Sequence, residues 1–81
     1  MTIYVGNIPF NLREEELQNV FAQYGEVTSV KIIKDKFTGK SKGFAFVEMA
    51  NNSEGATAVE QANGMEVKGR QLKVNEAKPK Q

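Results

Sequence analysis

The hydrophobic and polar positions of this chain follow two different periods along its length. Residues 2–6 and 42–49 alternate apolar and polar side chains, as strands do when successive side chains point to opposite faces. Residues 17–24 place Leu, Val, Phe and Tyr at helical spacing, and residues 55–62 do the same with small side chains. The pattern predicts the order strand, helix, strand, strand, helix, strand.

The ends of the two helices are predicted from capping residues. Asn11 is a favourable N-cap, and Glu14 three residues later would complete a capping box. Gly25 is expected to end the first helix as a left-handed cap. Ser53 is the expected cap of the second helix, and Asn63-Gly64 would stop it.

The remaining strands complete the predicted sheet. Residues 26–35 form the second strand, where Val27 is out of phase with Val30 and indicates a bulge or a delayed start of the strand. A short hairpin turning at Lys68-Gly69 would precede a last strand over residues 70–76. The fold class we expect is α+β: a ferredoxin-like βαββαβ sandwich with a four-stranded antiparallel sheet and both helices on one face. The other face of the sheet would stay open to solvent.

Two phenylalanines lie on the face of the third strand that is expected to contact solvent. One face carries Lys42, Phe44, Phe46 and Glu48, and the opposite face carries only apolar residues. Charged side chains are almost never fully buried unless they are paired, so the face with Lys42 and Glu48 should be solvated. Large apolar groups placed in water usually mark a binding surface.

The first strand repeats this arrangement with Tyr4, which lies opposite Ile3 and Val5. If the two strands are neighbours, Tyr4, Phe44 and Phe46 form one open surface, which we call the aromatic platform. Gly6 should leave a flat, uncrowded spot beside it. The alternative is a sheet covered on both faces, in which these rings are core residues.

The net charge of +1 conceals an uneven distribution. Residues 31–42 hold five lysines against one aspartate, and residues 68–80 hold five cations against one glutamate, whereas both predicted helices are acidic. With helices and strands on opposite sides, the strand side would attract a polyanion. The alternative is that lysine-rich loops are ordinary solvated surface.

The composition also sets limits on function. The chain has no histidine and no cysteine, so the commonest general base and the commonest soft metal ligands are missing. We expect no enzyme activity, no metal and no cofactor. No long apolar run suggests a membrane span, and the N-terminal residues lack the pattern of a signal peptide. We therefore expect a cytoplasmic monomer, or a nuclear one in a eukaryote, with one domain over residues 1–77 and a basic tail over 78–81.

Two segments resemble the RNA recognition motif family. Residues 3–8, Ile-Tyr-Val-Gly-Asn-Ile, are similar to its hexamer motif, and residues 42–49, Lys-Gly-Phe-Ala-Phe-Val-Glu-Met, to its octamer motif. Met49 replaces an aromatic at the last octamer position, which should face the core. Asn63-Gly64 and residues 69–74 extend the resemblance over nearly the whole chain.

The resemblance implies single-stranded RNA as the partner. Tyr4 and Phe46 would each stack a base, Phe44 would pack against the sugars between them, and Lys42 would pair with a phosphate. The residues expected to choose the sequence or to close over the strand are Asn7, Lys31, Gln71, Lys73, Asn75 and Lys78. Single-stranded DNA and a protein-binding domain of the same fold remain alternatives.

Overall fold

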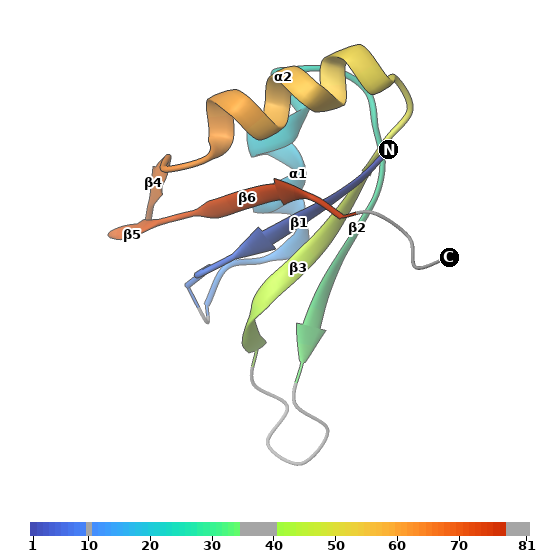
Figure 1. Cartoon of the computed structure of the whole chain (residues 1–81). Helices are drawn as coiled ribbons and strands as arrows, with labels where there is room; N and C mark the ends of the chain where they lie inside the picture. The colour runs from blue at the N-terminus through green and yellow to red at the C-terminus, as the bar shows by residue number, and fades with distance from the viewer. Residues whose placement is uncertain (10, 35–40, 78–81) are drawn as a thin grey trace.

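A computed structural model describes residues 1–9, 11–34 and 41–77, without the side chains of Lys34, Ser41 and Lys42. The predicted tail, residues 78–81, lies outside the described residues. The elements follow the expected order (Figure 1). They are β1 (Thr2–Gly6), α1 (Glu14–Ala22), β2 (Val27–Lys34), β3 (Ser41–Met49), α2 (Asn52–Ala62), β4 (Glu66–Val67), β5 (Arg70–Gln71) and β6 (Lys73–Glu76).

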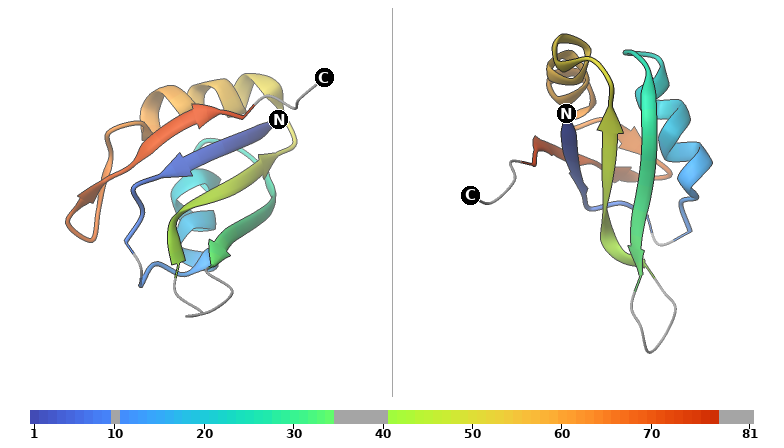
Figure 2. Two further views of the ribbon diagram at one scale, coloured as in Figure 1. Left: turned by 60° about the horizontal axis from the view of Figure 1, so that its bottom comes forward. Right: turned by 90° about the vertical axis from the view of Figure 1, so that its right-hand side faces the viewer.

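The main sheet has the strand order β2-β3-β1-β6, and all its pairings are antiparallel. In the left view of Figure 2 both helices lie behind the strands, so one face of the sheet is free of helices. This arrangement confirms the predicted ferredoxin-like βαββαβ class. Within the described ranges neither helix is long and apolar enough to cross a membrane.

The predicted last strand is interrupted at Leu72. The backbone N–H of Leu72 donates to the carbonyl of Met65 at 2.9 Å, and its carbonyl accepts from Gly64 at 2.8 Å. Residues 70–71 therefore pair with β4 in a small separate hairpin, and β6 is the part of the predicted last strand that pairs with β1. The predicted turn at Lys68-Gly69 is confirmed, because both residues have positive φ, at 49° and 86°.

The core lies between the sheet and the helices. Its largest fully buried side chain is Phe21 of α1, which packs with the inward residues of β1 and β3. Met49 is 1% exposed, as the alternation of β3 predicted. Burial of each large apolar side chain stabilises the fold by roughly 1.5–3 kcal/mol. Ile8 and Leu12, in the connection before α1, are also buried and carry no periodic signal in the sequence.

Small residues bring α2 close to the sheet. Of the expected buried face, Ala58 and Ala62 are buried together with the nearby Gly55, whereas Val59 is only partly buried. A Cβ at Gly55 would collide with the thioether sulfur of Met1, so a larger residue there would have to displace the Met1 side chain. The close approach packs α2 on β6, and to a smaller extent on β1 and β3.

Helix α1 begins later than predicted. Its N-cap is Arg13, whose backbone N–H donates to Glu16 Oε1 at 3.2 Å, while the Arg13 side chain makes no cap hydrogen bond. Asn11 is therefore not the cap. The reason is a turn closed by the bond from Leu12 N–H to the Pro9 carbonyl at 3.1 Å, which buries Leu12 before the helix can begin. Glu16 and not Glu14 accepts the hydrogen bond at the N-cap, so the carboxylate of Glu14 can make a contact elsewhere.

Two further cap predictions are wrong. Helix α2 is capped by Asn51, whose Oδ1 accepts from the backbone N–H of Glu54 at 3.0 Å, and not by Ser53. Gly25 does not have positive φ. Its hydrogen allows close packing instead, since a Cβ there would lie 2.5 Å from Glu54 Oε1. The predicted stop at Asn63-Gly64 is confirmed, because Asn63 is the C-cap of α2 and Gly64 has φ 86°.

Side chains from the helical layer reach both outer strands of the sheet. On β2, the N–H of Ile32 donates to Glu14 Oε2 at 3.2 Å. On β6, the N–H of Val74 donates to Asn63 Oδ1 at 3.1 Å. Unpaired edge groups are templates for pairing with another chain, so these two bonds protect the edges. The predicted bulge near Val27 is also confirmed as a register shift between Val27 and Ser29.

Candidate nucleic-acid interface

The aromatic platform lies on the helix-free face of the sheet, as predicted. The ring centroids of Tyr4 and Phe44 are 6.0 Å apart, those of Tyr4 and Phe46 6.0 Å, and those of Phe44 and Phe46 6.2 Å. The three rings form a nearly equilateral triangle, and all three side chains are partly exposed. The covered-sheet alternative is therefore excluded.

Strand register builds the platform from sequence-distant residues. Tyr4 of β1 pairs directly with Phe46 of β3 and with Asn75 of β6, while Lys31 of β2 pairs with Phe46. These four residues form one row across the sheet, with two rings in the middle and a polar side chain at each end. Directly opposed residues lie about 4.5–5.5 Å apart, so the end residues border the rings. Lys31 and Asn75 are exposed.

The ring of Tyr4 occupies the space above Gly6. A Cβ at Gly6 would lie 2.8 Å from the Tyr4 hydroxyl oxygen and 3.0 Å from its Cε1. The expectation that Gly6 leaves an uncrowded spot is therefore wrong. The glycine is buried beneath the ring and gives Tyr4 room to lie along the strand.

Asn7 connects the end of β1 to the β4–β5 hairpin. Its backbone has φ 57°, a left-handed conformation that asparagine tolerates better than most residues. Its Nδ2 donates to the Gln71 carbonyl at 2.7 Å, and its Oδ1 accepts from the Arg70 guanidinium at 3.3 Å. The side-chain amide of this predicted RNA-contacting residue is thus already bonded on both sides within the protein.

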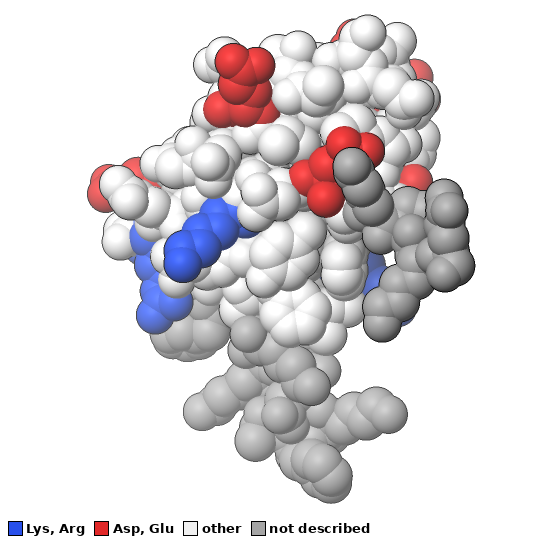
Figure 3. All heavy atoms as spheres, in the orientation of Figure 1, with Lys and Arg blue, Asp and Glu red and all other residues white. Residues whose placement is uncertain are grey.

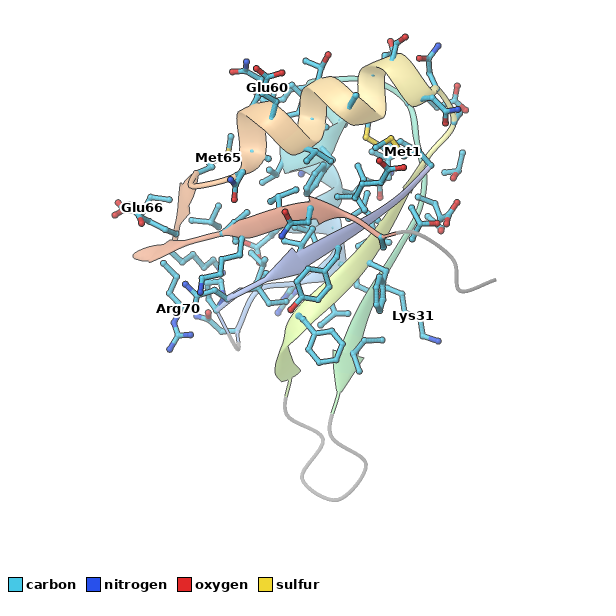
Figure 4. The ribbon with its side chains drawn as sticks, in the orientation of Figure 1. Met1, Lys31, Glu60, Met65, Glu66 and Arg70 are labelled. Atoms are coloured by element: carbon cyan, nitrogen blue, oxygen red, sulfur yellow. The ribbon has the colours of Figure 1, made fainter. Side chains whose placement is uncertain are left out.

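Exposed polar groups surround the rings. Gln71, Lys73 and Asn75 are exposed, and their side chains form no hydrogen bond to any other described residue. Lys31 points away from the sheet in Figure 4. The structure does not describe the side chain of Lys42 or any part of Lys78, so these two predicted contacts lie outside the described residues.

The predicted separation of charge is incomplete. In Figure 3 basic side chains lie at the left and right of the open face, while acidic ones lie along its upper side. Glu48 is one acid on this face, and it accepts a hydrogen bond from the hydroxyl of Thr2. Lys68, counted with the basic strand side in the sequence, instead pairs with Glu16 of α1 at 3.0 Å. The basic groups are therefore concentrated toward two sides of the platform.

Sequence reasoning did not assign a role to Arg70, which the structure places beside Asn7. The only signal was its position directly after the predicted turn at Lys68-Gly69. Within the part of the chain that the structure describes, no group of three or more His, Cys, Asp or Glu side chains is suited to hold a metal ion.

A four-stranded antiparallel sheet with partly exposed aromatic side chains on its open face defines a class of nucleic-acid-binding modules. The sequence pattern of one such family, the RNA recognition motif, matches residues 3–73. The chain belongs to the RNA recognition motif family.

Comparisons with individual proteins agree with this family. The chain is 49% identical to "Putative RNA-binding protein RbpF" of Nostoc sp., over its full length and 77% of that protein. Among solved structures, the RNA-binding protein PG1 has a TM-score of 0.93 at 44% identity, with 100% of this chain and 98% of that one covered. The RNA recognition motif domain of Rna15 with bound RNA (GU) has a TM-score of 0.86 at 33% identity, covering 96% of this chain and 83% of that one.

Proposed function

We propose that this protein binds single-stranded RNA on the aromatic platform. The observation that carries the proposal is the triangle of partly exposed rings on the helix-free face, with centroids 6.0 to 6.2 Å apart. Tyr4 and Phe46 each stack one base, and Phe44 packs against the sugars between them. The RNA bound to the Rna15 domain, a structural neighbour of this chain, supports this assignment.

Stacking supplies most of the affinity and little of the specificity. Each stacked base contributes roughly 1–3 kcal/mol, and every base has an aromatic face. Part of that energy is offset by the cost of ordering the strand. Two stacked bases, one sugar contact and the phosphate contacts of the lysines together correspond to binding on the order of micromolar for a short RNA.

Sequence preference comes from the polar groups around the rings. Asn75 and Lys31 border the row that contains Tyr4 and Phe46, within reach of the edges of stacked bases. Lys73 and Gln71 lie on the exposed β5–β6 side. The lysines also contact phosphates, a role in which we include Lys42 and Lys78.

The function is binding without catalysis, metal or cofactor, by a single copy of the chain. A protein-binding role for the sheet is less favoured, because the rings face solvent and are flanked by Lys31 and Lys73, which have no acidic partner among the described residues. Stacking does not read the 2′-hydroxyl, so single-stranded DNA is the competing ligand that the experiment must include.

The test compares Tyr4→Ala, Phe46→Ala and the double variant with Tyr4→Phe, which keeps the ring. Binding to a fluorescently labelled random-sequence octanucleotide, as RNA and as DNA, is measured by anisotropy. We expect each alanine to weaken RNA binding by about 5- to 150-fold, the equivalent of one lost stack. Tyr4→Phe should bind nearly as the parent does. Unchanged affinity in the double variant would overturn the proposal. If the parent protein binds the DNA octanucleotide more tightly than the RNA octanucleotide, the ligand is single-stranded DNA and not RNA.

A further inference from the structure

The β4–β5 hairpin is fastened to the body of the protein on two sides. On one side Lys68 Nζ lies 3.0 Å from Glu16 Oε2 of α1. On the other side Asn7, directly after β1, bonds both the carbonyl of Gln71 and the guanidinium of Arg70. A hairpin held at both sides presents its outward side chains in a fixed position.

The two cations of this hairpin are in different situations. Lys68 is neutralised by Glu16, whereas Arg70 is exposed and has no acidic partner among the described residues. Glu66, on the neighbouring strand, extends on the other side of the hairpin from Arg70 in Figure 4. The guanidinium therefore has one neutral contact, Asn7 Oδ1 at 3.3 Å, and most of its donors are available.

Arg70 lies next to the position of one stacked base. The Tyr4 ring covers Gly6, and Gly6 is followed directly by Asn7, to which Arg70 is bonded. On β6 the register partner of Gly6 is Lys73, which is also exposed and has no ion pair within the described part of the chain. A nucleotide stacked on Tyr4 would thus have two cations nearby, Arg70 beside Asn7 and Lys73 on β6.

The charges on the rest of the open face also favour placing the RNA backbone at the end next to the β4–β5 hairpin. At the other end of β1, Thr2 pairs in register with Glu48 and donates to its carboxylate. Acidic side chains also lie along the upper side of the face in Figure 3, including some at its left edge above the basic group. Phosphates are repelled from an acidic border and attracted to a basic one, so the backbone of a bound strand should run toward the hairpin.

We propose that Arg70, held by Asn7, binds a backbone phosphate of the nucleotide next to the base on Tyr4, and so extends the RNA site onto the β4–β5 hairpin. The inference rests on the proposed function. Guanidinium groups match the oxygens of a phosphate with paired donors, and the bond to Asn7 reduces the freedom that Arg70 loses on binding.

The test is the salt dependence of RNA binding in Arg70→Gln, with Lys68→Gln as the matched control. Both variants remove one positive charge from the same hairpin, but the Lys68 charge is already paired with Glu16. One phosphate contact to single-stranded nucleic acid contributes a slope of about −0.7 to log K against log salt. The affinity lost in Arg70→Gln should therefore be about 2.6-fold greater at roughly 50 mM than at roughly 200 mM salt.

The labelled random-sequence RNA octanucleotide again serves as probe, and Arg70→Lys, which keeps the charge, should restore most of the slope. If Arg70→Gln keeps the parental slope, or Lys68→Gln loses as much, the inference is overturned while the platform is unaffected. Failure of the parent protein to bind RNA would instead reject the proposed function. A second readout needs no variant: the Arg70 side-chain N–H resonance should shift on RNA titration of the unmodified protein, and that of Arg13 should not. Lack of that shift also overturns the inference.

Discussion

The ring of Tyr4 lies directly over Gly6, so that the tyrosine hydroxyl is 2.8 Å from the place where a Cβ at position 6 would stand. In Gly6→Ala this methyl group must displace the ring. The ring is the far end of a rotatable side chain, so the fold should lose little stability. We expect RNA affinity to fall several-fold while the melting temperature changes by only a few degrees.

Anisotropy titration and thermal melting measure these two effects. The control is the same substitution in a Tyr4→Ala background, where there is no ring to displace. If Gly6→Ala weakens binding equally in both backgrounds, the glycine acts on RNA by some route other than Tyr4.

The start of α2 gives a second prediction, because two polar residues compete for the capping role. Asn51→Ala removes the acceptor of the Glu54 N–H and should lower the free energy of unfolding by about 0.5–2 kcal/mol. Ser53→Ala, two residues away, should have almost no effect, since its hydroxyl caps nothing. Urea denaturation of the two variants checks this. A greater loss from Ser53→Ala would show that the cap is misassigned.

Asn63 and Glu14 protect the edges of the sheet, and their removal should reveal this. Asn63→Ala leaves the Val74 N–H without its acceptor and should cost about 1 kcal/mol of stability. Glu14→Ala does the same to Ile32 on the opposite edge. Urea denaturation measures the stability, and sedimentation at high concentration should show self-association of the alanine variants through the opened edges.

Asn63→Asp and Glu14→Gln are the matched controls, because each keeps an oxygen acceptor in place. They should remain close to the parent in stability and monomeric in sedimentation. Equal behaviour of the control and alanine variants would mean that these bonds do not guard the edges.

Stability should depend on pH through Glu16. Its pKa lies below the ordinary value of 4.5, chiefly because Lys68 donates a hydrogen bond to its carboxylate and secondarily because the Arg13 N–H does. A carboxyl with a lowered folded pKa contributes stability that is fully present above 4.5 and is lost as pH falls through the folded value. Glu16→Gln should therefore melt below the parent at pH 6 and approach it in strong acid.

Melting curves between about pH 2.5 and 6 test this sign. The neighbouring Glu15, exposed and without an ion pair among the described residues, supplies the control variant Glu15→Gln. A difference between Glu16→Gln and the parent that grows as pH falls would contradict the mechanism.

The aromatic platform was predictable because strand alternation leaves no choice of face. With Ile3, Val5, Ala45 and Val47 committed to the core, their neighbours had to point the other way, and the structure buries all four completely. The fold class followed from the order of the periodic segments. These features depend on side-chain periods, which the sequence states directly.

Features that depend on competition between similar residues were not predictable. Three consecutive glutamates before Leu17 allow more than one capping register, and only the buried Leu12 decides between them. The position of the Tyr4 ring depends on a side-chain rotation that no pattern reports. The role of Gly25 required the location of Glu54 on the other helix, and the place of Arg70 required the path of a hairpin.

The molecule is thin, only 18 Å along its shortest axis, because helices cover one side of the sheet alone. The residues that maintain folding and those that meet a ligand therefore alternate along the same strands yet point in opposite directions. Substitutions at outward positions can alter ligand preference without emptying the interior. Such a division lets ligand choice diverge among related chains while their architecture is preserved.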